Sequence, residues 1–333
     1  MLTFVFYLLF LLIFVVFAVY AERKTAAFIQ NRLGPMEVGP KGILQTLADL
    51  LKMLQKEDIK ADAVDKLPFL LAPFIVFTAI FAGFSVLPLN ANVAGSSISG
   101  GLFLLLAIIS LDVLGIVMAG WASNNKYSLY GAMRSVAQII SYEVPIGLSV
   151  LCVVLITGTL DLQEMSIQQA GNGFLSWNII SHPVLLIPLL IFFIAALAES
   201  NRTPFDLPES ESELVAGYHT EYSGFRWGIF MLSEYGMMLL LSIVITVLFF
   251  GGWNSPIPSF GSLMFYDWTS GMYWGTFWLL SKSLMLVFVQ MWVRWTLPRL
   301  RVDQLMSLSW KYLTPLSLLM LFVCGIWKLW LVS

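Results

Sequence analysis

The 333 residues are 59% hydrophobic and only 11% charged, against about 25% charged residues in soluble domains, so we expect a polytopic membrane protein. The net charge of −2 gives no reason to expect a nucleic-acid partner. Two cysteines in apolar runs and two isolated histidines exclude a zinc-finger or iron–sulfur ligand set. With no glycine-rich nucleotide motif, we expect no metal site and no cofactor bound by this chain alone.

An apolar run of about 20 residues is long enough to span a bilayer as a helix. The sequence contains eight such runs, and it predicts an all-α fold with one integral membrane domain over residues 1–333. The predicted spans are 2–20, 68–89, 101–121, 133–157, 182–199, 227–251, 274–296 and 312–331.

The basic residues predict the orientation of these spans. Sixteen of the eighteen lie in four segments, namely 21–67, 121–134, 199–226 and 294–311. Lysine and arginine collect on the inner side of a membrane, so these segments are predicted to face inward and both termini outward. The outer segments 90–100, 158–181 and 252–273 contain neither residue, and we expect plain connecting turns there.

The first inner segment is long and contains an amphipathic pattern. Apolar residues recur at helical spacing from Ile43 to Leu54, while Gln45, Asp49 and Lys52 take the other face. The pattern predicts a helix of about four turns at the membrane surface. Together with the corner at Glu22 and Arg23, this helix could border an opening for a lipid-soluble substrate.

Four ionisable residues fall inside predicted spans: Asp112, Glu143, Glu234 and Lys282. A charge at a span centre costs about 2.5–3.5 kcal/mol, so each should face the bundle interior, be neutral or be paired. The sequence favours proton handling over a structural hydrogen bond for Glu143 and Glu234, and leaves Asp112 open. Lys282 is expected to pair with one of these acids. Pro145 predicts a kink beside Glu143 that frees a carbonyl group for water.

An acidic segment lies on the inner side, between the fifth and sixth predicted spans. Six carboxylates occur from Glu199 to Glu221, and apolar residues among them, such as Phe205 and Leu207, predict partial burial. Like charges held together in a half-dry place keep protons that exposed carboxylates would lose. A solvated acidic loop is the alternative interpretation. The pattern favours a cluster that binds and releases protons beside the membrane.

Motifs on every inner segment resemble one known family, the NuoH-type membrane subunit of respiratory complex I, the proton-pumping NADH:quinone oxidoreductase. The motifs are residues 21–24, 31–35, 38–42 and 45–56 of the first inner segment, 120–127, 140–143, 198–213, 233–235 and 294–299, with Arg301, Asp303, Gln304 and Met306. They are long, specific and spread over the whole chain.

The resemblance implies a protein at the junction of the membrane arm and the peripheral arm that forms much of the quinone-binding chamber. Quinone would be the substrate, whereas FMN and iron–sulfur clusters would belong to partner subunits. These partners would be the peripheral-arm quinone-site subunits and adjacent small membrane subunits, within membrane lipid. A bacterial inner membrane is favoured over the mitochondrial one.

The resemblance also implies roles for particular acids, and the chemistry of quinone reduction suggests roles for particular arginines. The proton relay would use Glu143, Glu199, Glu213 and Glu234. The acidic loop at the quinone chamber would hold Asp206, Glu209, Glu211 and Glu221. The quinone entrance, or the stabilisation of an anionic quinone, would fall to Arg23, Arg202, Arg226 and Arg294.

Three other functions are compatible with a polytopic fold. One is the membrane anchor of an energy-converting hydrogenase or a related dehydrogenase. The second is a stand-alone cation or proton transporter, for which an inverted internal repeat would be expected, and we find no convincing repeat. The third is a scaffold that only holds two arms of an assembly together.

Overall fold

The structure is a computed structural model that describes residues 2–91, 100–207, 214–258 and 272–332. Within these ranges the regular elements are helices, as predicted. The α-helices are α1 (Leu2–Ile29), α2 (Gln45–Gln55), α3 (Lys66–Phe84), α4 (Gly101–Ile109), α5 (Asp112–Ala122), α6 (Lys126–Thr157), α7 (Leu162–Gln168), α8 (Asn178–Ser181), α9 (Leu186–Glu199), α11 (Gly224–Phe249), α13 (Met272–Thr296), α14 (Val302–Ser307) and α15 (Thr314–Val332).

The long apolar helices match the predicted spans. Seven in the described ranges have the length and composition to cross a membrane: Val5–Ile29, Lys66–Phe84, Gly101–Ala122, Lys126–Thr157, Gly224–Phe249, Trp274–Thr296 and Val302–Leu331. A shorter apolar helix, Pro183–Glu199, takes the place of the predicted span 182–199. The prediction of an all-α polytopic membrane fold is therefore confirmed.

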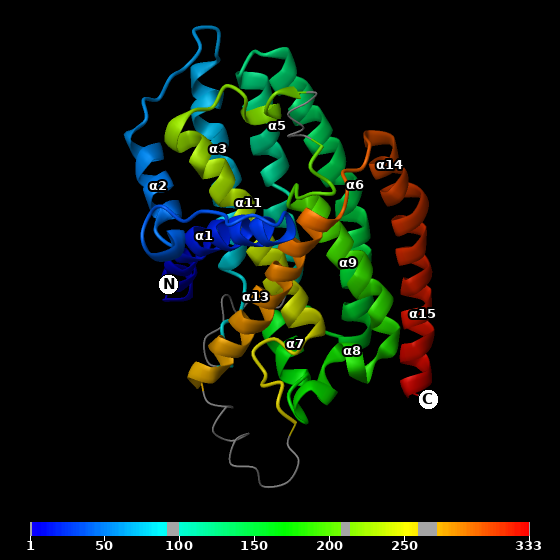
Figure 1. Ribbon diagram of the computed structural model, residues 1–333. Helices are drawn as coiled ribbons and strands as arrows, with labels where there is room; N and C mark the ends of the chain where they lie inside the picture. The colour runs from blue at the N-terminus through cyan, green and yellow to red at the C-terminus, as the bar shows by residue number, and fades with distance from the viewer. Residues whose placement is uncertain (1, 92–99, 208–213, 259–271, 333) are drawn as a thin grey trace.

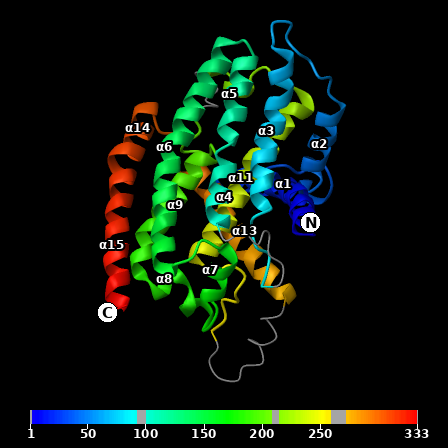
Figure 2. The ribbon, with the colours of Figure 1, turned by 180° about the vertical axis from the view of Figure 1, so that it is seen from behind.

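The helix α11 forms the centre of the bundle. The whole stretch Met237–Phe249 is buried, because α11 packs against α1, α3, α9 and α13. The second long helix, α6, packs against α5, α9 and α15, and α15 lies at the edge of the bundle (Figures 1 and 2). A helix that is apolar on nearly all sides is stable inside a protein core or in a membrane, and α11 takes the buried position at the centre of the bundle.

Several of the predicted inner and outer segments lie toward opposite ends of the bundle. The connection between α2 and α3 and the helix α14 lie at the upper end in Figure 1, whereas α7, α8 and the C-terminus lie at the lower end. The upper end is therefore the one to which the distribution of basic residues assigns the inner side.

The predicted span 101–121 is not one continuous helix. It divides into α4 and α5 at Ser110 and Leu111, and Asp112 is the first residue of α5 rather than the middle of a span. The N–H groups at a helix N-terminus favour a nearby carboxyl group. The break places the Asp112 carboxyl group in the first turn of a helix inside an otherwise apolar segment.

The predicted amphipathic helix corresponds to α2, which packs against α1 and α11. Its leucines remain about half exposed, with 45% for Leu47, 52% for Leu51 and 54% for Leu54. On the opposite face, Asp49 accepts a hydrogen bond of 2.6 Å from Arg23 of α1. The helix thus presents an apolar stripe to its surroundings and a polar stripe to the protein, as a helix at a membrane surface does.

The outer segment 158–181 is more ordered than the plain turns predicted for it, because it forms α7 and α8. These helices satisfy carbonyl groups at the end of α11. Gln169 donates to the carbonyl oxygen of Val247 at 2.9 Å, and Asn178 donates to that of Leu248 at 2.8 Å. Side chains cap the last turn of α11, whose carbonyl groups lack partners within the helix.

Lys282 belongs to the same cap, and the expectation that it pairs with Asp112, Glu143 or Glu234 is wrong. Its ammonium group donates to the carbonyl oxygens of Phe250 at 2.7 Å and Asn254 at 3.0 Å. It also lies 4.9 Å from the ring centroid of Trp177. A cation at a helix C-terminus is stabilised by the carbonyl dipoles, so Lys282 needs no carboxylate.

Replacing Lys282 with methionine should therefore lower stability without touching the acids. The variant Lys282→Met leaves the carbonyl groups of Phe250 and Asn254 without this donor, which should cost about 1–3 kcal/mol. The measurement is the thermal midpoint of the purified membrane assembly. Lys52→Met, at an exposed position of α2, is the control. An unchanged midpoint for Lys282→Met would contradict the capping role.

Candidate functional site

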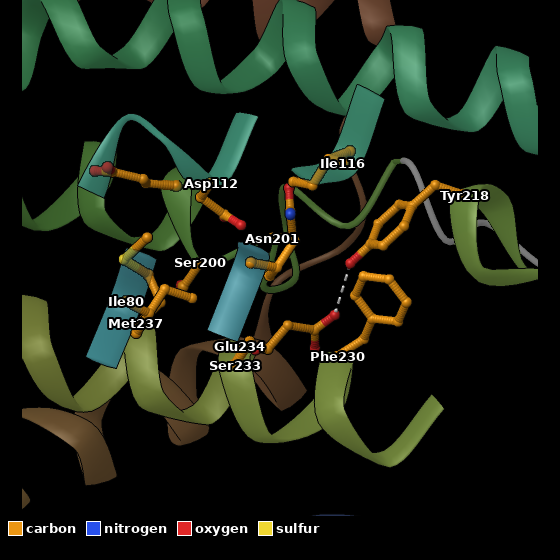
Figure 3. Close-up of a pocket in the computed structure, with 12 residues that line it drawn as sticks. Ile80, Asp112, Ile116, Ser200, Asn201, Tyr218, Phe230, Ser233, Glu234 and Met237 are labelled. Atoms are coloured by element: carbon orange, nitrogen blue, oxygen red, sulfur yellow. Dashed lines mark hydrogen bonds between the residues drawn. The ribbon is translucent and has the colours of Figure 1, made fainter. Parts of the chain in front are cut away.

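A small cavity lies where α3, α5, α9 and α11 meet. Three carboxyl groups line it, from Asp112 of α5, Glu199 of α9 and Glu234 of α11. Figure 3 shows Asp112 entering from α5 and Glu234 from α11, with the hydroxyl group of Tyr218 directed at Glu234. The part of this cavity that the centre of a water molecule can occupy has a volume of about 10 Å³. This is about enough for one water molecule.

The local sequence explains why three acids meet here. Glu199 is the last residue of α9, where the chain leaves the apolar helix and enters the acidic segment. Asp112 begins α5 after the break at Ser110 and Leu111. Glu234 lies on α11 next to the buried Ser233. Glu199 and Asp112 therefore lie at helix ends, whereas Glu234 lies within the continuous helix α11.

The acids of the cavity differ in their hydrogen bonds. Tyr218 donates to Glu234 at 3.4 Å. Asp112 and Glu199 are each only 6% exposed, and Asp112 Oδ1 and Glu199 Oε2 have no hydrogen-bond donor within the described ranges. Buried polar atoms are normally paired, so these two oxygens need either a proton bound to the carboxyl group or a hydrogen bond from a water molecule in the cavity.

Glu143 lies beside this cavity rather than in its lining. It is half-buried on α6, and its Oε1 atom is buried with no partner among the described residues. Glu143 and Asp112 both lie within electrostatic range of Glu199. The structure thus brings Glu199 and Glu234 to one cavity, and Glu143 lies within electrostatic range of Glu199.

The sequence predicted a kink at Pro145 that would open a carbonyl group to water, and the structure differs from this prediction. The helix α6 continues without a break from Lys126 to Thr157 through Pro145. The carbonyl group that proline leaves unpaired, that of Ser141, accepts a hydrogen bond from the Ser309 hydroxyl instead of being open to water. A side chain from another helix therefore fills the gap.

A second buried cluster surrounds Glu22 at the inner end of α1. Arg202 donates to its carboxylate at 3.2 Å, Tyr235 donates at 2.5 Å, and Arg294 of α13 forms an ion pair with the same group. Glu22 is 3% exposed and Arg202 is 5% exposed. One carboxylate thus joins α1, α11, α13 and the segment that follows α9.

This cluster, which we call the Glu22 cluster (Glu22, Arg202, Tyr235 and Arg294), has an excess of positive charge. Its own side chains are two arginines and one glutamate, and the Glu234 carboxyl group also lies within electrostatic range of Arg202. Burial works against the Arg202 guanidinium, but Glu22, Tyr235 and Glu234 outweigh burial and raise the pKa of Arg202 above its ordinary value. Nε and Nη2 of Arg202 find no acceptor in the described part of the chain. The cluster could therefore accept a further anionic group.

The other arginines predicted for the quinone site pair with acids nearer the surface. Arg23 binds Asp49 at 2.6 Å and Arg226 binds Asp58 at 2.8 Å. Burial opposes the charge of Asp49, but its hydrogen bonds from Arg23 and Gln45 hold its pKa below the ordinary value. These two arginines therefore lie near α1, α2 and the start of α11, where each pairs with a partly exposed acid.

The structure describes some of the acids predicted for the acidic loop and not others. Asp206 is buried and accepts a hydrogen bond of 2.8 Å from Arg299, and Glu221 accepts one of 2.6 Å from Asn125 at the start of α6. Glu209, Glu211 and Glu213 lie outside the described residues. The loop is thus held at both ends by contacts with other inner segments.

Sequence reasoning missed the position of Glu22 between two arginines and the contacts of Tyr218 and Tyr235 with carboxyl groups, and it left the role of Asp112 open. A signal was present for Glu22, since an acid next to an arginine at the inner end of an apolar span needs a partner. No sequence pattern indicated that residues 22, 202, 235 and 294 would meet, because they lie on separate elements.

In the described ranges, no group of three or more His, Cys, Asp or Glu side chains could hold a metal ion.

Comparisons with known proteins identify the family. The family model described as NADH dehydrogenase matches residues 2–325. An H-type NADH-quinone oxidoreductase subunit of Cytophaga hutchinsonii is 54% identical over 94% of this chain and 94% of its own length. The corresponding protein of Chlorobaculum tepidum is 54% identical over 93% and 86%, and that of Brevibacillus brevis is 48% identical over 90% and 84%. The chain therefore belongs to the NADH dehydrogenase family, as the H-type (NuoH) membrane subunit of NADH-quinone oxidoreductase, respiratory complex I.

Proposed function

We propose that the chain forms much of the quinone-binding chamber of its complex and the first part of the carboxylate relay that couples quinone reduction to proton pumping. The observation that carries the proposal is the water-sized cavity at which Asp112, Glu199 and Glu234 converge. Two carboxyl oxygens without a donor beside a space for water are suited to accept and pass on protons.

The Glu22 cluster supports the quinone part of the proposal. Adding two electrons and two protons converts a quinone to a quinol, and the intermediate is anionic. The two arginines and the donor atoms of Arg202 that have no acceptor in the described ranges would stabilise that anion. The half-exposed leucines of α2 would provide an apolar border along which a lipid-soluble quinone reaches the cluster.

Coupling would follow from the contact between the two sites. Arg202 lies three residues after Glu199 and within electrostatic range of Glu234, so a negative charge at the Glu22 cluster changes the field at the cavity. The acids would respond by changing their protonation, and the protons would move on toward Glu143. Moving one charge across the membrane against 100 mV requires about 2.3 kcal/mol, so this local response has to be linked to a second state of the acidic segment.

The names of the relatives suggest the surroundings of the chain. As part of a NADH-quinone oxidoreductase, it would contact peripheral-arm subunits that carry the FMN and the iron–sulfur clusters, and adjacent small membrane subunits. We place it in a bacterial inner membrane with both termini on the periplasmic side, because the basic segments lie at the end of the bundle that would face the cytoplasm.

A photoreactive quinone analogue tests the chamber. Irradiation of the intact complex should label this protein near the Glu22 cluster or α2, and excess natural quinone should prevent the labelling. Labelling confined to other subunits, or labelling here that natural quinone does not reduce, would contradict the proposal.

The cavity adds Asp112 to the proposed relay, although the sequence left its role open. Asp112→Asn keeps the size of the side chain but cannot release a proton, so it should lower the proton-pumping rate about tenfold or more. Asp112→Glu should retain part of the rate because it keeps the acid. The measurement is proton uptake by vesicles that contain the whole complex. Equal rates for Asp112→Asn and the unmodified protein would exclude Asp112 from the relay.

A further inference from the structure

Two helix irregularities meet beside Glu143. The first is Pro145, which has no N–H group and therefore leaves the carbonyl oxygen of Ser141, four residues earlier, without its helical partner. The helix nevertheless continues through Pro145, and the Ser141 side chain donates to Ala137 at 2.6 Å. Something other than α6 itself has to satisfy the Ser141 carbonyl.

The second irregularity is a π-helical turn, Leu308–Leu313, between α14 and α15. This turn presents Ser309, which is fully buried, and its hydroxyl donates to the Ser141 carbonyl oxygen at 2.5 Å. Thr314 follows the π-turn, and its hydroxyl donates to the carbonyl oxygen of Ser309 at 2.9 Å. π-Turns are rare and often occur at functional positions.

Two further contacts hold the same turn of α6 against the C-terminal helices. The indole N–H of Trp310 donates to the Ser141 hydroxyl at 3.2 Å. Tyr142 is buried, and its hydroxyl donates to the carbonyl oxygen of Leu305 at 3.0 Å. Ser141 and Tyr142 are thus both tied to the segment from α14 to the π-turn.

These contacts fix the residue that follows. Glu143 comes directly after Ser141 and Tyr142 in the same helical turn, and its carboxyl group lies within electrostatic range of Glu199. A turn of α6 with an unpaired carbonyl group would be free to bend at Pro145. Such bending would move the Glu143 carboxyl group relative to Glu199, and proton transfer is sensitive to distances of this kind.

We propose that Ser309 is a positioning residue for Glu143: presented by the π-turn, its hydroxyl replaces the hydrogen bond that Pro145 removes from α6 and holds the Glu143 turn at its place in the relay. This inference rests on the proposed function, because it assumes that Glu143 carries protons. It assigns a role in coupling to the π-turn that precedes α15.

The test compares Ser309→Ala with two matched serine variants in vesicles that contain the whole complex. Ser309→Ala should lower proton pumping and quinone reduction together by about fivefold, the factor that corresponds to one hydrogen bond of about 1 kcal/mol. The KM for quinone should not change. Ser149→Ala on α6 and Ser317→Ala on α15 also remove fully buried hydroxyls, but these only bond carbonyls within their own helices. Both controls should stay within twofold of the unmodified rate.

Restoring the missing backbone donor gives the sharper readout. Pro145→Ala supplies an N–H group that can reach the Ser141 carbonyl within α6, so the double variant Pro145→Ala with Ser309→Ala should recover most of the lost rate. The double variant also keeps the test informative if Ser309→Ala alone assembles poorly, because in the double variant the Ser141 carbonyl group is paired within α6. A rate that stays low in an assembled double variant would overturn the positioning role.

Glu143→Gln separates this inference from the proposed function. If Glu143→Gln blocks pumping while Ser309→Ala is normal, the positioning role is wrong and the relay stands. If Glu143→Gln itself pumps at the normal rate, the relay assignment of Glu143 fails, and the positioning role fails with it.

Discussion

Glu199→Gln should reduce quinone reduction and proton pumping together by about a hundredfold, the lower end of what a positioned proton-transfer group contributes. Glu199 is buried at the cavity, and its Oε2 atom has no donor in the described ranges. Glutamine keeps the shape of the side chain but cannot titrate. The measurement is the initial rate of both activities in vesicles that contain the intact complex.

Loss of stability would not explain such a result. The glutamine amide brings an N–H donor into a place where the structure has unpaired acceptors, so Glu199→Gln should assemble as well as the unmodified chain. Glu164→Gln on α7 makes the same exchange at an exposed position of the opposite end and should leave both rates unchanged. A Glu199→Gln complex with normal rates and a normal number of protons per electron pair would exclude Glu199 from the relay.

Glu22→Gln should cause the largest loss of stability. It leaves the charges of Arg202 and Arg294 at a mostly buried place with no carboxylate between them. Removing one partner of a buried ion pair costs about 3–5 kcal/mol because the remaining charge is uncompensated. The measurement is the thermal midpoint of the detergent-solubilised complex and the amount of this protein that assembles.

The matched control is an ion pair at the surface. Asp49→Asn removes the partner of Arg23, but their side chains are 25% and 45% exposed, so the effect should stay within about 1 kcal/mol. The double variant Glu22→Gln with Arg294→Gln should be more stable than Glu22→Gln alone, because one uncompensated charge is removed. If it is no more stable, unpaired charge is not the cause of the loss.

Much of the fold could be predicted because the sequence pattern of a membrane helix is local. Runs such as 227–251 are mostly apolar, and in a membrane a helix satisfies their backbone groups. The amphipathic helix α2 could be predicted for the same reason, since its leucines recur at helical spacing.

What could not be predicted depends on contacts between distant segments. The break before Asp112 has no proline or glycine to mark it, and it becomes understandable only from the cavity that Asp112 lines. Lys282 was expected to meet an acid because a buried cation needs a partner, yet backbone carbonyls of Phe250 and Asn254 fill that need. Sequence patterns describe side chains but do not show which backbone groups a fold leaves unpaired.

The sequence predicted which residues belong to the candidate site better than it predicted which of them contact each other. Glu199 and Glu234 do meet at one cavity. Arg202 and Arg294, expected as separate stabilisers of a quinone anion, share Glu22 instead. Because they come from different elements, only the folded chain reveals that both arginines share one carboxylate.

Infrared difference spectroscopy of the intact complex tests most directly whether the buried acids change protonation when quinone is reduced. The spectrum of reduced minus oxidised complex should contain a change in the C=O stretching band of protonated carboxyl groups, and this change should shrink in Glu199→Gln. A band change of equal size in both proteins, with electron transfer to quinone intact, would contradict the view that the Glu199 carboxyl group responds to quinone chemistry.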